Sequence, residues 1–401
     1  MLQVLPLAEA RELLLKNAEK IKKKIEKMPL SDAKGRVLAK TAAAGDDLPA
    51  FDRSAVDGFA VIARDTFGAS AAQPALLQLA GEVKMGERAG VALAAGECAA
   101  VWTGGELPRG ADAMVMLEEA ERLSGGLVAM ESASAPGRHV VYRGDDAKRG
   151  DLLLPAGRRL SSRDIGLLAA YGHSEVSTFA RPRVAIVSTG DELIDPAQIP
   201  QGAQIRDANG PMLSAACEEA GACARFIGRV PDDEDALLSV LREAAEHCDL
   251  LLLSGGSSAG AKDAAARCVG CLGSVLFHGL ALKPGKPTLA GRIGDTIVIG
   301  LPGHPAAAYL VFHALVRPLL SALSGESFAE RTVSAALTEA APSNHGREEL
   351  LLVRLNGDTA GIVHGKSGLI SPLTRADGYV RIPRDAEGLP KGARVDVILF
   401  E

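Results

Sequence analysis

Four short apolar runs in the second half of the chain carry the clearest pattern of hydrophobic and polar positions. Each run ends in a turn that contains glycine, and stretches with helical periodicity separate the runs. Continuous apolar runs of this length are typical of strands that are buried on both faces of a parallel sheet. We therefore predict a central three-layer α/β/α domain over residues 181–326, with a mainly parallel sheet. The predicted strands are 184–187, 225–228, 250–253 and 296–299, and the predicted helices are 211–221, 233–247 and 263–271.

The amino-terminal pattern predicts a long amphipathic helix over residues 8–28. Apolar residues recur at spacings of four, three, four and three from Leu14 to Met28, and lysines lie mostly on the other faces. A run of lysines is usually a solvated helix face. Pro29 would end the helix. We expect residues 1–28 to pack on the connecting segment or on the α/β domain.

The remaining segments predict smaller domains built on β-strands. Residues 48–141 consist of short segments rich in Gly, Ala and Val, which indicates an inserted β-rich domain. Taken alone, the dipeptide Asp57–Gly58 within it favours a hairpin turn. Residues 29–47 and 142–180 are assigned to a connecting domain, in which Gly172 closes a helix over 162–171. Residues 327–401 alternate again and predict a small carboxyl-terminal β domain.

Composition and charge exclude several classes of function. The chain has 401 residues, a net charge of −6 and only 3% aromatic residues, which argues against a nucleic-acid partner. No run of eighteen or more consecutive apolar residues marks a membrane span, and the amino terminus lacks a secretory pattern. We therefore expect a cytoplasmic protein with neither a nucleic-acid nor a membrane partner.

The cysteines give no strong sign of a metal or redox site. All six are scattered among helical and strand patterns, as free thiols in a reducing compartment are. Cys268 and Cys271 have the C-x-x-C spacing, but a structural zinc would need a second ligand pair, and none lies at a convincing spacing. We favour a structural role for this pair.

A glycine-rich turn, Ser254 to Gly260, joins the third predicted strand to a helical stretch. Glycines let backbone N–H groups approach an anion, and the following helix offers its positive end. The spacing is neither a dinucleotide-binding fingerprint nor a P-loop. Phosphate binding and a plain strand-to-helix turn both remain open for this segment.

The segment Lys283-Pro284-Gly285-Lys286-Pro287 is more specific. Its prolines exclude a regular helix or a central strand, so both lysines project from a stiff loop. Such a loop suits a tetrahedral oxyanion or a phosphate, with each ammonium group acting as a point charge. The alternative is a plain turn with two solvated lysines.

Carboxylates at the predicted strand ends suit Mg²⁺, which takes one or two protein oxygens and completes its shell with phosphates and water. These carboxylates are Asp191, Glu192, Asp232 and Asp263. Asp232 has an alternative role as the N-cap of the next helix. The stiff turn from Gly300 to Pro305 contains His304, which is either a ligand or base or a structural residue.

Together these motifs resemble the molybdopterin molybdenumtransferase family, the MoeA proteins, to which the carboxyl-terminal domain of gephyrin and the E-type domain of plant Cnx1 are related. The likeness covers essentially the whole chain, and its motifs occur in the family's order. The motifs are FDRSAVDGFA (51–60), WTGGELPRGADAMVM (102–116), STGDEL (188–193), RDANG (206–210), SGGSSAGAKD (254–263), KPGKP (283–287) and GLPGHP (300–305).

The resemblance implies that molybdate is inserted into adenylylated molybdopterin with the help of Mg²⁺, and that hydrolysis of the adenylate releases AMP and molybdenum cofactor. It also implies an elongated homodimer, with the active site between the α/β domain of one subunit and the β-rich domain of the other. Handover to molybdoenzymes and contact with the adenylyltransferase are further implied partnerships.

The resemblance assigns roles to residues by their positions in the motifs. The pterin and metal site would contain Gly255, Gly256, Ser258, Asp263, Glu192, Asp232 and Asp146, with Asp263 and Glu192 as metal ligands. Molybdate would be attracted by Lys283, Lys286, Arg347 and Ser367. Asp57 and Thr103 would enter from the partner subunit, and Pro302 and Pro305 would shape the floor of the cleft.

Other readings fit the sequence less well. An adenylyltransferase would normally consist of the α/β domain alone, and a nicotinamide dehydrogenase would need a glycine fingerprint that is absent from this sequence. A non-catalytic scaffold is the reading from a different class, although Asp263 and the lysine loop are both present. Tungstate stays open as an alternative to molybdate.

Overall fold

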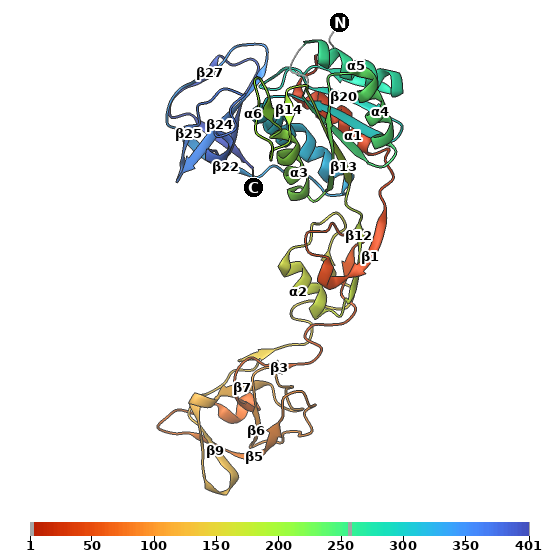
Figure 1. The fold of residues 1–401 in the computed structure, drawn as a ribbon. Coiled ribbons are helices and arrows are strands. Elements are labelled where there is room, and N and C mark those ends of the chain that lie inside the picture. The colour runs from red at the N-terminus through yellow and green to blue at the C-terminus, as the bar shows by residue number, and fades with distance from the viewer. Residues whose placement is uncertain (1–3, 256–258, 401) are drawn as a thin grey trace. The chain divides into compact units, whose positions relative to one another are not determined.

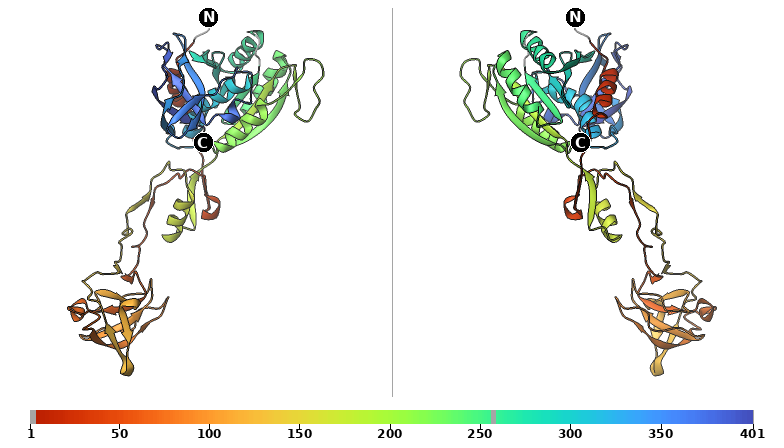
Figure 2. Two further views of the ribbon diagram at one scale, coloured as in Figure 1. Left: turned by 90° about the vertical axis from the view of Figure 1, so that its left-hand side faces the viewer. Right: turned by 90° about the vertical axis from the view of Figure 1, so that its right-hand side faces the viewer.

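The structure is a computed structural model that describes residues 4–255 and 259–400, apart from the side chains of residues 259–263. The chain folds into two compact units (Figures 1 and 2). The first unit contains residues 1–40, 157–161 and 175–401, and the second contains residues 41–156 and 162–174. Segments predicted to form the connecting domain therefore occur in both units.

The first unit is built around a mainly parallel sheet, as predicted (Figure 1). Its four parallel strands contain the four predicted apolar runs, and two antiparallel strands extend one edge. In spatial order, the strands are β16 (Cys223–Val230), β13 (Arg183–Thr189), β17 (Leu250–Gly255), β21 (Thr296–Leu301), β20 (Leu289–Ile293) and β18 (Ser274–His278).

Helices cover both faces of this sheet, which confirms the three-layer prediction. Alternate residues of β17 face opposite cores: Leu250 and Leu252 pack in one, and Leu251 and Leu253 in the other. The first core is covered by α1 (Leu7–Ala18), α3 (Asn209–Glu219), α6 (Pro305–Val311) and α7 (Arg317–Leu323). The second is covered by α4 (Glu234–Ala245) and α5 (Ala259–Leu272). Both faces of β17 are thus buried, which explains why its run 250–253 is apolar at every position.

A π-helical segment, Phe312–Val316, joins α6 to α7 into one continuous helical stretch. This stretch, Pro305–Leu323, is long and apolar enough to cross a membrane by length and composition. However, 83% of the tested window is buried inside the protein, where its residues form part of the first core. Its hydrophobicity is therefore accounted for by packing within the fold.

The carboxyl-terminal residues form the predicted β domain, whose strands are arranged as a barrel. The strand order is β19 (Leu282–Lys283), β24 (Glu348–Asn356), β25 (Thr359–Ile362), β22 (Thr332–Leu337), β28 (Arg394–Leu399) and β26 (Gly378–Ile382), with β26 also paired to β24. The strand β19 belongs to the lysine loop of the α/β domain. Its pairing with β24 sets Lys283 opposite Glu349.

The second unit has a mostly antiparallel sheet, as expected for the inserted β-rich segment. Its strands in spatial order are β7 (Ala113–Met116), β4 (Gly58–Val61), β6 (Glu97–Val101), β5 (Ala75–Val83), β9 (Leu127–Met130) and β8 (Ala120–Arg122). This unit also contains β2 (Ala42–Ala43) paired with β11 (Leu152–Leu154), and α2 (Ser162–Ala170). Gly172 follows α2 with φ 77°, as a helix-ending glycine should.

The hairpin predicted at Asp57–Gly58 is wrong. The strands on either side of this dipeptide do not pair with each other: β3 (Arg53–Ser54) pairs with β10 (Val140–Val141), and β4 pairs with β6 and β7. The close approach of β7 explains Gly58 instead. A Cβ atom there would lie 2.0 Å from the carbonyl oxygen of Val115.

The long amino-terminal helix is also wrong in its second half. Helix α1 ends at Ala18, and Ile25–Pro29 form strand β1, which pairs with β12 (Glu175–Phe179). Continuing the helix would stack lysines three and four positions apart, and each such like-charged pair costs about 0.2–0.5 kcal/mol. The antiparallel pairing with β12 overrides the apolar spacing that suggested a helix.

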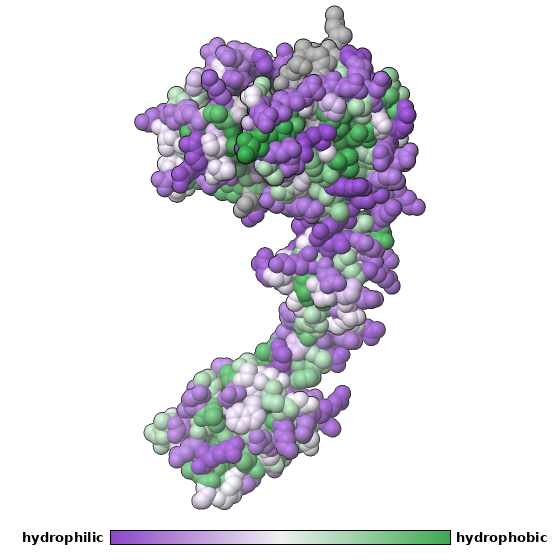
Figure 3. Space-filling model, in the orientation of Figure 1, coloured by the Kyte–Doolittle hydropathy of each residue, from purple (hydrophilic) through white to green (hydrophobic). Residues whose placement is uncertain are grey.

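The connection between β14 (Leu193–Ile194) and β15 (Ile205–Arg206) projects from the α/β domain in the side views (Figure 2). It carries Ile199, whose side chain is 81% exposed. On the face shown in Figure 3, hydrophilic residues cover most of the first unit, and hydrophobic residues gather in two areas, near the positions of α6 and β13 in Figure 1.

Candidate functional site

Three carboxylates gather at the carboxyl ends of β13 and β16, which are neighbours in the sheet. The backbone N–H of Asp232 donates to Asp191 Oδ1 at 3.0 Å. Gly190 has φ 148°, and a Cβ atom there would lie 2.7 Å from Glu192 Oε2. The glycine therefore provides both the backbone conformation and the space that bring the Glu192 carboxylate back over the strand end.

Partial burial of its carboxyl group raises the pKa of Asp232, and the neighbouring charges of Asp191 and Glu192 raise it further. The N-cap alternative for Asp232 is wrong, because the cap of α4 is Asp233, whose carboxylate accepts from Ala236 N at 2.8 Å. Asp232 is thus an acid that repels its neighbours, in an arrangement that a cation would stabilise.

The glycine-rich turn begins on the next strand, at Gly255. Gly255 has φ 134°, and a Cβ atom would lie 1.9 Å from the carbonyl oxygen of Thr189 on β13. Only glycine fits this close approach of two strands. Gly256 and Ser258 lie outside the described residues, and Asp263 is described only by its place in α5.

A buried asparagine ties three strand-end loops together. The side-chain amide of Asn209 donates to Ser254 Oγ and to the carbonyl oxygen of Gly303, both at 2.8 Å. It thereby links the start of α3 to the end of β17 and to the turn before α6. Nearby, the carboxylate of Asp207, which is 2% exposed, accepts from Gly210 N at 3.0 Å. These contacts bring the RDANG, SGG and GLPGHP motifs to the same edge of the sheet.

A cavity of about 740 Å³ lies beside this edge, between the lysine loop, α6 and the carboxyl-terminal domain. Its polar lining residues come from both domains and include two lysines. The lining residues with polar side chains are Lys283, His304, Glu349, Lys366 and Ser367. Its floor is mostly apolar, with Leu310 from α6 and leucines of β24. A few polar groups converging over an apolar floor are typical of small-molecule sites.

Lys283 already has a negative partner in this cavity. Its Nζ lies 2.9 Å from Oε1 of Glu349, a side chain that is 9% exposed. The hydroxyl group of Ser343 donates to the other carboxylate oxygen at 2.6 Å. The loop is held rigid as well, because Gly285 O accepts from both the N–H and the hydroxyl group of Thr288. The ammonium group is therefore fixed in position and partly neutralised.

His304 contacts the carboxyl-terminal domain directly. Its Nδ1 lies 3.0 Å from Ser367 Oγ, and the backbone N–H of Ala306 donates to Ser367 O at 3.2 Å. Pro305 occupies the first turn of α6, where a missing N–H costs nothing. Pro302 is buried at the end of β21. The turn before α6 thus contacts the carboxyl-terminal domain and holds Ser367 at the cavity.

Two of the predicted oxyanion residues lie outside this lining. Lys286 and Arg347 are both exposed, and neither belongs to the described residues that line the cavity. Within the described part of the chain, no ion pair is formed by either side chain. Lys286 is therefore a cation without a fixed partner at the end of the same loop, in contrast to Lys283.

The remaining predicted residues belong to the second unit. Asp57 Oδ1 accepts from the backbone N–H of Thr103 at 2.8 Å and from its hydroxyl group at 2.7 Å. These bonds lower the pKa of Asp57, with the backbone bond as the largest cause. Asp146 accepts from the hydroxyl group of Tyr171 at 3.1 Å. Asp57 and Thr103 thus form an exposed, hydrogen-bonded pair in which the carboxylate of Asp57 is ionised.

The described residues do not form a complete metal site. Among them, no group of three or more His, Cys, Asp or Glu side chains is arranged to hold an ion. Mg²⁺ does not require such a group, since it often binds through one or two carboxylates and takes phosphate oxygens and waters for the rest. The adjoining carboxylates of Asp191, Glu192 and Asp232 fit that kind of site.

Sequence reasoning missed several residues of the site. Asp207, Asn209 and Ser254 lie inside motifs that carried the resemblance, so their polar character in a buried turn was a usable signal. Glu349 and Lys366 lie outside those motifs, and only the pairing of β19 with β24 and the fold of the carboxyl-terminal domain reveal them.

Three family descriptions match successive parts of this chain. They are "MoeA N-terminal region (domain I and II)" over residues 5–172, "Probable molybdopterin binding domain" over residues 185–322, and "MoeA C-terminal region (domain IV)" over residues 334–400. A molybdopterin molybdenumtransferase of Bacillus subtilis is 30% identical over 94% of this chain and 90% of its own length. The chain belongs to the MoeA family. The resemblance inferred from the motifs is confirmed.

Further MoeA relatives agree in sequence and in fold. Molybdopterin molybdenumtransferase 2 of Mycobacterium tuberculosis is 32% identical over 92% of this chain and 94% of its own length. The crystal structure of a molybdopterin biosynthesis MoeA protein from Pyrococcus horikoshii is 37% identical, covers 100% of both chains and has a TM-score of 0.85. The fold predicted from the sequence is therefore that of a MoeA protein.

Proposed function

We propose that this MoeA protein inserts molybdate into adenylylated molybdopterin, with hydrolysis of the adenylate and release of AMP and molybdenum cofactor. Membership of the family makes it a molybdopterin molybdenumtransferase of molybdenum cofactor biosynthesis. One observation supports the proposed molybdate insertion and adenylate hydrolysis: a carboxylate cluster and a lysine-bearing cavity lie along the same edge of the sheet. The hydrogen bonds of Asn209 link the loops between them.

The carboxylate cluster is the proposed metal end of the site. Glu192 and Asp263 would hold Mg²⁺, with Asp232 beside them, and the bound ion would neutralise charge on the phosphoanhydride. The raised pKa of Asp232 supports this assignment, since repelling carboxylates gain stability when a cation is present. Gly255, Gly256 and Ser258 would receive the pterin phosphate at the turn before α5, since glycines let backbone N–H groups approach an anion.

The lysine-bearing cavity is the proposed oxyanion end. Lys286 and Lys366 supply positive charge, while Lys283 is held between Glu349 and the open cavity. Ser367 offers a hydroxyl group beside His304, and Arg347 contributes positive charge from the start of β24. Pro302 and Pro305 would fix the floor of the cleft. An oxyanion would therefore meet several donors and only one opposing carboxylate among the described lining residues.

Asp57 and Thr103 are proposed to act from the second subunit of a homodimer. Their bonded pair is exposed and holds its carboxylate ionised, which suits a group that completes a site on another surface. Asp146 would line the same cleft. We place the dimer in the cytoplasm, with adenylylated molybdopterin supplied by an adenylyltransferase and the product handed to molybdoenzymes.

The decisive test is AMP release from adenylylated molybdopterin by the purified protein with Mg²⁺, in the presence of molybdate, tungstate or neither. Oxyanion-dependent release supports the transferase proposal, and the ratio between the two oxyanions shows which one the site prefers. Folded protein that releases no AMP in any of the three mixtures contradicts the proposal and favours a non-catalytic scaffold. A parallel reaction with EDTA tests the metal, because release that persists unchanged would remove Mg²⁺ from the mechanism.

A further inference from the structure

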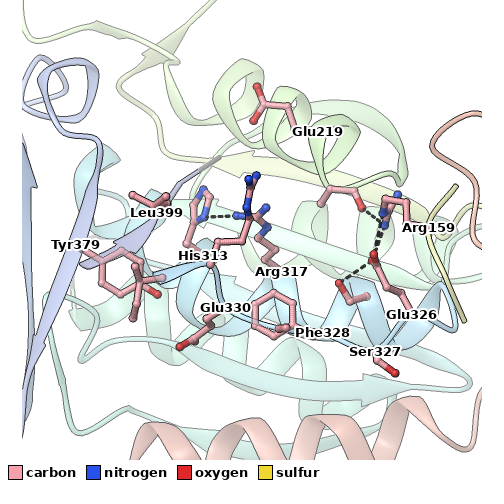
Figure 4. A pocket seen from close by; sticks show the side chains of 15 residues that line it. Arg159, Glu219, His313, Arg317, Glu326, Ser327, Phe328, Glu330, Tyr379 and Leu399 are labelled. Atoms are coloured by element: carbon pink, nitrogen blue, oxygen red, sulfur yellow. Dashed lines mark hydrogen bonds and ion pairs between the residues drawn. The ribbon is translucent and has the colours of Figure 1, made fainter. Parts of the chain in front are cut away.

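A second cavity lies within the first unit, at the end of α3 away from the candidate site, and we call it the Arg317 cavity (Figure 4). It has a volume of about 330 Å³. The cavity is lined by the end of α3, the helical stretch from His313 to Ser321, the connection 326–331 and the strands β26 and β28. Helix α3 starts at Asn209, and its 11 residues place the two ends about 16 Å apart. The Arg317 cavity is therefore separate from the catalytic edge.

Arg317 is a half-buried cation without a carboxylate partner among the described residues. Its Nη1 donates to the carbonyl oxygen of Phe400 at 2.8 Å. The carboxylates that line the cavity interior form ion pairs with other arginines. Glu326 accepts two bonds from Arg159, at 3.0 and 2.7 Å, and Glu330 pairs with Arg11 and Arg381. The guanidinium group thus keeps N–H donors that no charged group of the described chain satisfies.

His313 presents a second unused donor at the same place. Its Nδ1 lies 3.5 Å from Arg317 Nη1, which only donates, so Nδ1 accepts and Nε2 carries the hydrogen. His313 is 6% exposed, and its Nε2 has no partner within the described part of the chain. Burial and the charge of Arg317 lower the pKa of His313 to about 3, so the ring is neutral near pH 7. A buried N–H group without an acceptor is costly.

The local fold holds these two donors in place. His313 lies in the π-helical turn 312–316, a form that often marks functional positions in helices. The centroid of its ring lies 4.6 Å from the ring centroid of Tyr309 and 4.8 Å from that of Phe400. In Figure 4, His313 and Arg317 lie side by side, with Leu399 and Tyr379 on one side and Phe328 below. The donors are thus bordered by apolar and aromatic surface.

We propose that the Arg317 cavity binds a small anion, whose carboxylate or phosphate oxygens accept from Arg317 and His313 and whose apolar body packs on Phe328 and Leu399. The exposed rim carries one residue of each charge, Glu219 and Arg331, so the interior arginine decides the sign of the ligand. The cavity volume fits a ligand of about the size of a substituted benzene ring, at the small end of typical binding sites. The bound anion would contact both the α/β domain and the carboxyl-terminal domain.

The proposal is tested on the full chain by titration calorimetry with benzoate, phenyl phosphate and benzamide. Benzoate and phenyl phosphate separate a carboxylate ligand from a phosphate ligand, and benzamide has nearly the shape of benzoate without its charge. We expect at least one anion to bind in the millimolar range or tighter, and benzamide to bind roughly tenfold more weakly or not at all. Absence of binding by both anions, or equal binding of benzamide, overturns the proposal.

Two substitutions then locate the binding. Arg317→Gln removes the charge at similar volume and should weaken anion binding roughly tenfold or more, because charge-assisted bonds are the stronger ones. His313→Phe keeps the ring and removes the N–H donor, and should weaken binding several-fold. It also provides a test if Arg317→Gln does not fold. Lys286→Ala alters the proposed oxyanion end of the catalytic site and should leave benzoate binding unchanged. Binding that Lys286→Ala abolishes and His313→Phe preserves would move the anion to the catalytic cleft and contradict this proposal.

Discussion

The two halves of the candidate site handle charge in opposite ways. On the side of β13 and β16, Asp191, Glu192 and Asp232 face one another, and no cation among the described residues forms an ion pair with them. On the side of the lysine loop, Lys283 is matched with the buried carboxylate of Glu349. One half is left with uncompensated negative charge, whereas in the other half Glu349 balances only one of the lysines within the described part of the chain.

This difference indicates what each half needs from outside. The acidic half would gain stability from a divalent cation, because repulsion between its carboxylates is relieved only by positive charge. The lysine half would gain stability from an anion only to the extent that its positive charges outnumber the single negative charge of Glu349. Lys286 and Lys366 supply that excess, so they should decide the affinity for an oxyanion. The substitutions below should therefore act on metal-dependent chemistry in one half and on oxyanion affinity in the other.

Asp263→Ala should have the largest effect. The resemblance assigns Asp263 to the metal site, so its loss should reduce AMP release by roughly a hundredfold or more. Folding should be intact, because the change removes a charge rather than core volume. The rate of AMP release and the melting temperature of the purified variant check the two parts separately. A melting temperature far below that of the wild type would show that Asp263 is structural.

Asp232→Asn should reduce AMP release by roughly tenfold or more, because it removes one carboxylate from the acidic half at almost unchanged shape. The chain offers a matched control in the neighbouring residue. Asp233→Asn should leave activity near wild type, since Asn caps a helix about as well as Asp. Equal losses in both variants would indicate a disturbed α4 rather than a missing metal-site charge.

Lys286→Ala and Glu349→Gln should change oxyanion affinity in opposite directions. The first removes a cation without a fixed partner, so the molybdate concentration for half-maximal AMP release should rise several-fold. The second removes the partner of Lys283 while keeping an acceptor for Ser343, so that concentration should fall. The measurement is the molybdate dependence of AMP release at saturating Mg²⁺. A rise in both variants would place Glu349 in a supporting role and contradict the charge argument.

The sequence was sufficient for the features that depend on buried strands. The runs at 184–187 and 250–253 are apolar at every position because helices cover both faces of the sheet. Parallel strands end at the same edge, so carboxylates that follow different strands were expected to meet there. The approach of Asp232 to Asp191 agrees with this expectation.

The sequence was not sufficient where a contact joins distant segments through another domain. Glu349 meets Lys283 only because β19 adds to the sheet of the carboxyl-terminal domain, and Ser367 meets His304 across the same boundary. The prediction of a long amino-terminal helix was wrong for a related reason. Apolar spacing continues through Ile25, but the pairing partner β12 lies far along the chain and gives no local signal.

The smallest expected effect is a shift in the pH dependence of AMP release, which distinguishes the contribution of Asp191 from that of Asp232 within the acidic half. Asp191 is one of the causes that raise the pKa of Asp232, so Asp191→Asn should lower that pKa towards the ordinary value of an aspartic acid. Asn keeps the oxygen that accepts from the backbone N–H of Asp232, so the loop geometry should survive. If ionised Asp232 supports the metal, activity is lost as the pH falls through its pKa. The acid side of the AMP-release profile should therefore move to lower pH in the variant.

The same substitution should also change stability with a defined sign. A carboxyl group whose folded pKa is raised destabilises the folded state once the pH exceeds its unfolded value, because the unfolded chain releases the proton more readily. Removing the charge of Asp191 should therefore raise the melting temperature near neutral pH, and less so in strongly acidic buffer. Added Mg²⁺ should raise the melting temperature of the wild type more than that of Asp191→Asn, since the ion then has less repulsion to relieve. A melting temperature that responds to neither the substitution nor Mg²⁺ would mean that the three carboxylates do not act as one charged group.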